Sequence, residues 1–357
     1  MKDLDPEIAF QGIGGERMQA EGVDIIARSS DMAVVGLTEV FAKLDIIWNT
    51  YFRLRSILKK EKPDLLILID YPGFNIRLAG AAKRFGVPVL YYISPQLWAW
   101  KSGRAKKIDR RVDRMAVILP FEKEFYRKMG TTLPVEYVGH PLMDQIPAKL
   151  NKKEIERELG IEDGDRVIGL LPGSRKEEIE KLLPDMIRAA EIMSSQYKNL
   201  KCVLPVASTI SDELINGIAG DSPLKINITR KGVYHALRVC EFAFVASGTA
   251  TLETAIMCVP MIITYRISSF SFRIAKWLVK VDYVGLVNLV AGEEVAPELL
   301  QEDVNPENMA AGAMEILDST ERYSAIKEKL DNVKKSLGSS GASARTARIA
   351  LDMMRGY

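Results

Sequence analysis

Asp70 is the side chain whose place in the sequence best suits acid–base chemistry. It directly follows an apolar run at residues 65–69 and precedes Tyr71, Pro72 and Gly73. A carboxylate at the end of a strand can remove a proton from a sugar hydroxyl if burial raises its pKa from about 3.9 towards neutrality. The alternative is an aspartate that caps the turn after the strand. The residues by themselves leave both interpretations open.

A first turn suited to phosphate lies at residues 170–175, Leu-Leu-Pro-Gly-Ser-Arg. An apolar run there leads through Gly173 and Ser174 into a helix whose free backbone N–H groups suit an anion. Arg175 adds two charge-assisted donors, each worth about 1.5–3 kcal/mol. Glu178, in the first turn of the same helix, is also expected to bind the substrate. The alternative is an ordinary strand-to-helix turn capped by Ser174.

A second turn of the same kind lies at residues 245–253, Val-Ala-Ser-Gly-Thr-Ala-Thr-Leu-Glu. Ser247, Gly248 and Thr249 offer backbone and hydroxyl donors to a diphosphate. Glu253 follows Thr249 by one helical turn, where its carboxylate can accept hydrogen bonds from ribose hydroxyls. Its alternative role is to complement the helix dipole. Two such turns in one domain favour a nucleotide site more than either does alone.

Aromatic and basic residues mark a third candidate site, which follows the apolar run at residues 87–93. Gln96, Trp98 and Trp100 precede a cluster of cations at residues 101–114. Paired tryptophans beside cations suit a lipid interface or an anionic acyl-sugar phosphate. A solvated surface accounts for the same residues, and a nucleic-acid patch is not supported by the overall charge.

An amphipathic helix is expected over residues 32–48. Its apolar positions recur at helical spacing, and they are Leu37, Val40, Phe41, Leu44, Ile47 and Trp48. Such a helix can lie on a membrane or hold acyl chains. A helix packed on a sheet gives the same pattern.

These candidates need strands to position them, and eight short apolar runs are expected to be strands. They are residues 65–69, 87–93, 115–119, 135–138, 167–171, 202–206, 242–246 and 261–265. Continuous apolar runs separated by helical stretches are typical of parallel sheets covered on both faces. We therefore predict an α/β protein with two doubly wound domains that meet between residues 141 and 164. Ligands bind beyond the carboxyl ends of such strands, so the active site is expected in the cleft between the domains.

Composition excludes several classes of protein. The 357 residues are 47% hydrophobic and 27% charged with a net charge of +2, which is typical of a globular protein and argues against a polyanion binder. The apolar runs are shorter than the ~20 residues of a membrane span, and the first residues do not resemble a signal peptide. Three dispersed cysteines and two histidines favour reduced thiols in the cytoplasm and no metal site.

Two further features of the sequence, a DxD pattern and His140, each allow more than one interpretation. The sequence Asp163-Gly164-Asp165 matches the DxD pattern of metal-dependent sugar transferases, but it precedes a strand and is interpreted as a turn. His140 follows an apolar run at the expected domain boundary, where it is either a hinge residue or a catalytic one.

Taken together, the segments resemble the lipid-A-disaccharide synthase family of inverting glycosyltransferases. The resemblance runs in order along nearly the whole chain. Its segments are Gly12-Ile13-Gly14-Gly15 with Met18 and Gly22, Asp-Tyr-Pro-Gly-Phe-Asn from Asp70, Ser-Pro-Gln-Leu-Trp-Ala-Trp from Ser94, residues 119–126, Val-Gly-His-Pro, Leu-Pro-Gly-Ser-Arg, Ala-Ser-Gly-Thr-Ala-Thr-Leu-Glu and residues 281–292.

The resemblance implies a GT-B architecture of two facing Rossmann-like domains, with C-terminal helices that cross back to the first. We expect an acceptor domain at residues 1–145, a UDP-sugar domain at 146–335 and a final helix at 336–357. It further implies transfer of 2,3-diacylglucosamine from its UDP conjugate to the 6-hydroxyl of 2,3-diacylglucosamine 1-phosphate, which releases UDP and forms a β-1,6 bond without a metal or cofactor.

The resemblance also implies roles for single residues and a location. Asp70 matches the general base, and Arg175, Glu253 and Asn288 match donor-site positions. The helix at residues 32–48 matches a segment that contacts membrane or acyl chains. A peripheral protein on the cytoplasmic face of the inner membrane is expected, with no nucleic-acid partner and with a homodimer as a possible assembly.

One departure from the family pattern concerns the first strand. Family members open with a strand and a Gly-Glu-Ala-Ser-Gly-Asp loop, whereas Met1 here matches a position at the end of the helix that follows. We therefore expect the first domain to lack a central strand, which about 25–30 upstream residues would supply. The competing functions are a UDP-N-acetylglucosamine 2-epimerase, another lipid-linked N-acetylglucosamine transferase and an inactive binding remnant.

Overall fold

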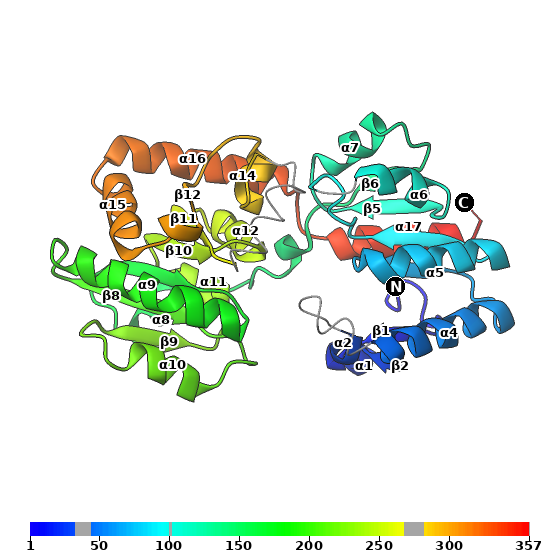
Figure 1. Ribbon diagram of the computed structural model, residues 1–357, viewed down its shortest axis with the longest axis horizontal. Coiled ribbons are helices and arrows are strands. Elements are labelled where there is room, and N and C mark those ends of the chain that lie inside the picture. The colour runs from blue at the N-terminus through cyan, green and yellow to red at the C-terminus, as the bar shows by residue number, and fades with distance from the viewer. Residues whose placement is uncertain (33–43, 100–101, 268–281, 357) are drawn as a thin grey trace. The chain divides into compact units, whose positions relative to one another are not determined.

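A computed structural model describes residues 1–32, 44–99, 102–267 and 282–356. They divide into two compact units, unit 1 with Met1–Pro141 and Gly341–Tyr357, and unit 2 with Leu142–Ser340. Both chain crossings fall at turns that contain glycine or proline, as expected for short connections between domains. The last helix, α17 (Ala342–Met354), therefore belongs to unit 1, where it is drawn in red in Figure 1.

Unit 2 contains a six-stranded sheet in the order β12-β11-β10-β7-β8-β9, and every pairing between its strands is parallel. The strands are β7 (Arg166–Leu171), β8 (Leu200–Pro205), β9 (Ile226–Thr229), β10 (Phe242–Ala246), β11 (Met261–Tyr265) and β12 (Glu298–Leu300). The first strand, β7, lies in the middle, and the order reverses between β7 and β10. This is the arrangement of a doubly wound nucleotide-binding fold.

Helices cover the unit 2 sheet because its central strands are mostly apolar. All five residues of β10 are buried. Helix α9 packs on β7, β8, β10 and α15, while α11 and α12 pack on β8 and β10. The helices are α8 (Lys152–Glu158), α9 (Lys176–Ser194), α10 (Asp212–Ala219), α11 (Val233–Leu237), α12 (Thr249–Ile256), α14 (Leu286–Ala291), α15 (Pro306–Leu317) and α16 (Thr320–Ser336).

Unit 1 contains a four-stranded sheet in the order β3-β4-β5-β6 and a separate pair, β1-β2, all parallel. The strands are β1 (Gln11–Gly14), β2 (Asp24–Arg28), β3 (Leu66–Ile69), β4 (Val89–Tyr92), β5 (Arg114–Val117) and β6 (Val135–Tyr137). All eight strands expected from the apolar runs are therefore present, to within a few residues at each end.

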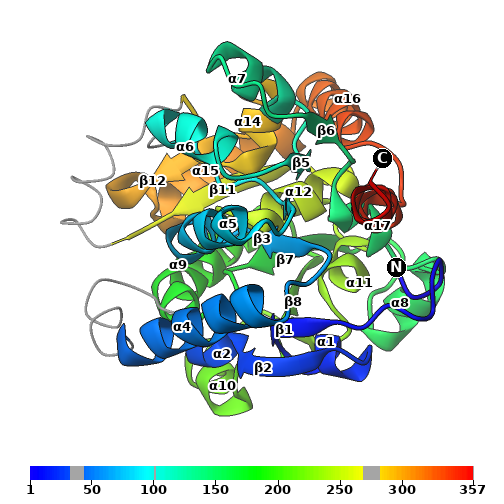
Figure 2. The ribbon, with the colours of Figure 1, turned by 90° about the vertical axis from the view of Figure 1, so that its right-hand side faces the viewer.

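Helices in unit 1 pack on both sides of β4 and β5. On one side of this sheet, helices α4 and α5 contact each other, as Figures 1 and 2 show. Ile349 and Ala350 of α17 join a second apolar cluster with Leu90, Ala116 and Val138. The remaining helices are α1 (Glu16–Ala20), α2 (Ser29–Met32), α4 (Leu44–Lys60), α5 (Pro72–Phe85), α6 (Ala105–Asp109) and α7 (Glu122–Lys128).

The prediction that a helix over residues 32–48 ends at Trp48 is wrong. Helix α4 begins at Leu44 and continues past Trp48 to Lys60. Nothing in the sequence stops it there, because Ile47, Tyr51 and Leu54 extend the apolar stripe that packs on the core. Leu37, Val40 and Phe41 lie outside the described residues.

Candidate functional site

Two strand-to-helix turns in unit 2 begin side by side where the strand order reverses. Leu171 of β7 is the register partner of Val245 of β10. Because the strands are parallel, the residues that follow them leave the same edge of the sheet. Ligands of doubly wound folds bind at this switch point. We call residues 173–175 and 247–249 together the switch-point site.

Glu178 occupies the first turn of the switch-point site with its own carboxylate. Its Oε2 accepts hydrogen bonds from the N–H groups of Ser174, at 3.2 Å, and Arg175, at 3.4 Å. Its Oε1 accepts from Nη1 of Arg175 at 2.9 Å. The donors that the sequence analysis assigned to an anion are thus already bound. The Arg175 side chain of this pair is 66% exposed, so the pair is worth less than about 1 kcal/mol and a phosphate can displace the carboxylate.

Gly173 makes this compact turn possible. Its φ of +107° lies in a region that residues with a Cβ rarely adopt. A Cβ at Gly173 would lie 2.3 Å from Oε2 of Glu178. The glycine therefore lets the Glu178 carboxylate approach the backbone, and it leaves the same space open to a ligand oxygen.

In the second turn the candidate backbone donors are Gly248 and Thr249, because the N–H of Ser247 donates to the carbonyl of Thr264 at 2.9 Å. Gly248 precedes α12 with a φ of +137°, and its side-chain position faces open space. Thr249 begins α12 and is exposed. Ser247 donates its hydroxyl proton to the carbonyl of Val284 at 3.1 Å, so its oxygen is left as an acceptor. The turn fits a diphosphate held mainly by backbone N–H groups.

Glu253 lies one turn into α12, as the sequence predicts. Its side chain is half-buried, and desolvation raises the pKa of its carboxyl. A partly buried carboxylate at this position can accept hydrogen bonds from a sugar. Contact with a ribose stays a prediction.

Asn288 is held inside unit 2 by hydrogen bonds, and its role at the donor site stays a prediction. The residue is fully buried. Its Nδ2 donates to the carbonyl of Ala296 at 2.7 Å and to Oε1 of Glu298 at 2.9 Å, while its Oδ1 accepts from the N–H groups of Val295 and Ala296. Because Glu298 also accepts from the Gly285 N–H at 2.9 Å, Asn288 positions the start of α14.

Asp70 lies at the carboxyl end of β3 in a tightly fixed backbone. Asp70 and Tyr71 both adopt left-handed conformations, with φ of +46° and +42°. The Asp70 carbonyl accepts from Nδ2 of Asn75 at 2.8 Å and from the hydroxyl of Tyr91 at 2.5 Å, which hold this strained turn in place. The residue is exposed, yet partial desolvation raises the pKa of its carboxyl, and the Tyr71 N–H opposes that rise.

Glu122 is a buried residue of unit 1 that the sequence analysis did not single out. Its carboxylate accepts from the N–H groups of Leu119, at 2.9 Å, and Ile118, at 3.2 Å, and from the indole of Trp98 at 3.4 Å. Burial raises its pKa to about 7. Its place three residues after Leu119, at the first position of α7, is the signal that would have revealed a capping glutamate.

The aromatic segment after β4 divides into inward and outward residues. Trp98 is half-buried and packs edge-on against Phe121, with 5.2 Å between ring centroids. Gln96 is exposed, and Trp100 lies outside the described residues. Trp98 therefore fixes this segment, while Gln96 is available to a ligand.

Helix α4 presents an aromatic patch to solvent. Trp48 and Phe52 are 44% and 55% exposed and stack with 5.9 Å between ring centroids. We call these two residues the α4 patch. Ile46 is also 43% exposed, but it lies on another face of the helix. Leu44, at the start of the helix, is half-buried.

Three further expectations concern His140, metals and membrane spans. Burial lowers the pKa of His140 to about 4, which keeps it neutral at pH 7.

The Glu-Asp-Gly-Asp segment forms a turn in which Asp165 pairs with Lys201 at 2.5 Å. Among the described residues, no cluster of three His, Cys, Asp or Glu suits a metal ion. No helix in the same ranges has the length and apolar character to span a membrane.

Comparison with known proteins decides the family. The family model "Lipid-A-disaccharide synthetase" matches residues 1–351. The chain belongs to this family. Among its lipid-A-disaccharide synthase relatives, that of Trichlorobacter lovleyi is 45% identical over 350 residues, which cover 98% of this chain and 91% of the relative. That of Syntrophus aciditrophicus is 46% identical over 356 residues, covering 99% and 92%.

Solved structures support the fold of this lipid-A-disaccharide synthase family member. The UDP-GlcNAc 2-epimerase of Neisseria meningitidis, bound to UDP-GlcNAc, aligns with a TM-score of 0.61 at 13% identity and covers 96% of this chain and 99% of its own. The calicheamicin glycosyltransferase CalG4 aligns with a TM-score of 0.61 at 13% identity, covering 97% and 91%.

These findings confirm the predicted family, the α/β fold with parallel sheets and the enzyme class. The protein is a glycosyltransferase of lipid A biosynthesis, and its substrates are lipid A precursor sugars. The roles of single residues are not tested by the comparisons.

Proposed function

We propose that this chain transfers 2,3-diacylglucosamine from UDP-2,3-diacylglucosamine to the 6-hydroxyl of 2,3-diacylglucosamine 1-phosphate. The products are a β-1,6-linked disaccharide and UDP. The observation that carries the donor half of this proposal is the pairing of Leu171 with Val245, which sets two anion-suited turns beside each other at a switch point.

The donor diphosphate binds at the switch-point site. The N–H groups of Ser174 and Arg175, once released from Glu178, donate to the diphosphate together with those at the start of α12. The positive end of each helix dipole adds to their attraction. When the donor binds, the Arg175 side chain breaks its ion pair with Glu178 and pairs with the diphosphate. The arginine thus exchanges one carboxylate partner for a ligand with two charged phosphates. The same groups stabilise the UDP that leaves during the reaction.

Asp70 acts as the general base. Its carboxylate accepts the proton of the acceptor 6-hydroxyl while the hydroxyl oxygen attacks the anomeric carbon from the face opposite UDP. The bond from that carbon to the phosphate oxygen breaks, and its electron pair leaves with UDP. Two observations support this role, namely the position of Asp70 at a strand end and its raised pKa. Single inversion at the carbon converts an α-linked donor into a β-linked product.

The acylated substrates bring the protein to a phospholipid surface. The α4 patch offers Trp48 and Phe52, which suit the interface between headgroups and acyl chains. We therefore place the protein at the cytoplasmic face of the inner membrane as a peripheral protein. We also keep the prediction of a homodimer, which light scattering tests.

Release of UDP tests the proposed reaction directly. The protein is mixed with UDP-2,3-diacylglucosamine, with and without 2,3-diacylglucosamine 1-phosphate, and both UDP and the lipid products are measured. We expect UDP in equal amount to disaccharide, and only when the acceptor is present. UDP without acceptor would indicate hydrolysis, and an epimerised donor would indicate an epimerase; either result contradicts the proposal.

A further inference from the structure

The backbone of unit 1 is strained at the carboxyl ends of β3 and β4. Asp70 and Tyr71 have φ of +46° and +42°, and Ile93, the residue after β4, has φ of +62°. Residues with a Cβ rarely adopt such conformations, and a β-branched residue does so least readily. Strained residues of this kind gather at functional sites and persist only where other contacts hold them. The contacts around Asp70 therefore identify the groups that keep it in place.

The regular pairing of β3 with β4 breaks off at the Asp70 carbonyl. The Asp70 N–H still donates to the Tyr92 carbonyl at 3.4 Å. A parallel ladder continued by one more bond would bring the Ser94 N–H to the Asp70 carbonyl. Because Ile93 is left-handed, the chain after β4 leaves that path. The Asp70 carbonyl accepts instead from two side chains.

Those side chains are Tyr91 and Asn75. The Tyr91 hydroxyl lies 2.5 Å from the Asp70 carbonyl oxygen, and Nδ2 of Asn75 lies 2.8 Å from it. The same Nδ2 donates to the Ile69 carbonyl at 3.0 Å. A carbonyl oxygen has two lone pairs, so the two donors occupy both. Tyr91 is fully buried and Asn75 is 8% exposed, so both bonds are shielded from water.

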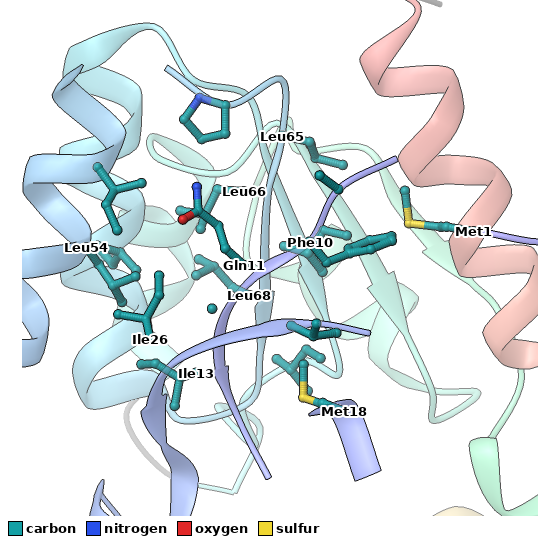
Figure 3. A pocket seen from close by; sticks show the side chains of 18 of the residues that line it. Met1, Phe10, Gln11, Ile13, Met18, Ile26, Leu54, Leu65, Leu66 and Leu68 are labelled. Carbon is teal, nitrogen blue, oxygen red and sulfur yellow. The ribbon is translucent and has the colours of Figure 1, made fainter. Parts of the chain in front are cut away.

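Both donors belong to regular elements of unit 1. Tyr91 is the register partner of Leu68 and shares an apolar cluster with Leu68 and Phe74. Asn75 lies in the first turn of α5. The other edge of β3 borders an apolar cavity of about 840 Å³, and Leu68 is among the residues that line it (Figure 3). In this structure the Asp70 turn is therefore held from β4 and from α5.

The Tyr91 hydroxyl keeps its proton and so remains a donor. Burial is the largest cause that raises the pKa of Tyr91, and the charges that Asp70 and Tyr126 carry when ionised raise it further. A side-chain hydrogen bond with Asn75 opposes the rise. Tyr91 is thus unsuited to accept a proton from a substrate at neutral pH, and its part is to hold the carbonyl.

We propose that Tyr91 and Asn75 are positioning residues for Asp70, whose two hydrogen bonds fix the turn and thereby the direction of its exposed carboxylate. The inference rests on the proposed role of Asp70 as the general base. A base must lie within hydrogen-bond reach of the proton that it removes, and a shift of about 1 Å can cost about 10²-fold in rate. Because Tyr91 and Asn75 are buried, they act through Asp70 rather than by contact with the substrate.

A double-mutant cycle distinguishes positioning from a role in stability alone. Tyr91→Phe removes only the hydroxyl, and it is made both in the wild-type chain and in Asp70→Asn. We expect kcat to fall about 10- to 100-fold in the wild-type background and less than about twofold in Asp70→Asn, where no base remains to be positioned. The KM for the donor should change less than about threefold, because the donor binds to unit 2.

Tyr323→Phe is the matched control. Tyr323 is a half-buried residue of unit 2 whose hydroxyl donates to the Glu241 carbonyl at 2.9 Å. Each variant removes one bond to a backbone carbonyl, so both should lower the melting temperature, and only Tyr91→Phe should lower kcat. A kcat of Tyr91→Phe within about twofold of wild type, or an equal fall in both backgrounds, would overturn the proposal.

The pKa of the Asp70 carboxyl gives a readout that needs no turnover. Carboxyl ¹³C NMR measures it, and Asp70→Asn assigns the signal. Release of the turn exposes the carboxyl to water, so Tyr91→Phe should lower its raised pKa towards 3.8, while Tyr323→Phe should leave it unchanged. The same Asp70 pKa in wild type and Tyr91→Phe would overturn the proposal.

Asn75→Leu covers the case in which Tyr91→Phe does not fold. Leucine is close to asparagine in shape but has no donor, and the same cycle with Asp70→Asn applies to it. Asp70→Asn alone reports on the proposed reaction. If its turnover equals that of wild type, the role of Asp70 as base is contradicted and the positioning role falls with it. If Asp70→Asn is slow and the second change lowers kcat equally in both backgrounds, the positioning role alone is overturned.

Discussion

Leu171 and Val245 are register partners in adjacent parallel strands, and each is followed within a few residues by a glycine in a conformation of positive φ. Because these two residues pair, the turns that follow them lie at the same edge of the sheet. The local sequence around each turn allows an ordinary strand-to-helix connection. We propose that their adjacency makes a diphosphate site, because a diphosphate has enough oxygens to accept hydrogen bonds from both turns.

Substitutions of Arg175 and Glu178 should change the affinity for UDP in opposite directions. Arg175→Ala removes a charge-assisted contact, so we expect UDP affinity to fall about tenfold to a hundredfold. Glu178→Gln removes the carboxylate that occupies the turn, so we expect affinity to rise several-fold. Isothermal titration with UDP measures both, and Lys176→Ala on the exposed surface of the same helix is the control. Weaker binding by Glu178→Gln would instead favour the ligand contact expected from the sequence.

Gly173→Ala should destabilise unit 2. An alanine at a φ of +107° is strained, and its Cβ meets the Glu178 carboxylate, so we expect a loss of about 1–3 kcal/mol in the free energy of unfolding. Gly217→Ala is the matched control, because Gly217 lies inside α10 with open space around it. That change should stabilise the protein by about 0.5–1 kcal/mol. Urea unfolding distinguishes them, and equal effects would contradict the conformation of the first turn.

Glu122 should make stability depend on pH. Its pKa rises from about 4.5 in the unfolded chain to about 7 in the folded protein, so the folded state holds a proton that the unfolded state loses. Stability from this group is therefore complete below about pH 4.5 and falls as pH rises to about 7, by about 3 kcal/mol in all. Glu122→Gln should lose this dependence. Thermal unfolding at pH 5 and pH 8 compares the two proteins, and parallel curves would contradict the burial of an ionisable Glu122.

The α4 patch should drive binding to lipid. Replacing both Trp48 and Phe52 by Ser removes two exposed aromatic rings, and we expect sedimentation with anionic phospholipid vesicles to fall about tenfold or more. Ile192→Ser with Ile228→Ser is the control, because these exposed apolar residues lie in unit 2. Equal loss in both pairs would mean that general hydrophobicity, rather than the α4 patch, binds the vesicle.

Much of the fold could be predicted from the sequence, since buried parallel strands are continuous apolar runs. The four strands that were missed lack that signal. In β9, Asn227 interrupts the apolar residues, and in β12 the half-buried Glu298 does. Both are edge strands of the unit 2 sheet, so one side of each is free of a neighbour. Strands β1 and β2 are short and partly exposed for a similar reason.

The two turns of the site could be predicted from the sequence, but the hydrogen bonds within the site could not. Gly173 and Gly248 could be located because a strand-to-helix turn with positive φ favours glycine. The burial of Asn288 could not, because its partners Ala296 and Glu298 come into reach only when the chain folds back after α14. Glu178 was placed correctly at the start of a helix, but its competition with an anion depends on rotamers that the sequence does not contain.

Asp70 carries the catalytic half of the account, so Asp70→Asn tests it most directly. The variant is compared with wild type and with Asp64→Asn, an exposed carboxylate just ahead of β3, in whichever form of the chain shows acceptor-dependent UDP release. We expect turnover to fall about 10²–10⁴-fold while UDP affinity stays within a factor of about three. Because desolvation raises the pKa of Asp70, wild-type kcat/KM should fall as pH drops through that raised value. Turnover of Asp70→Asn close to that of wild type, with the same pH profile, would contradict the assignment of Asp70 as the base.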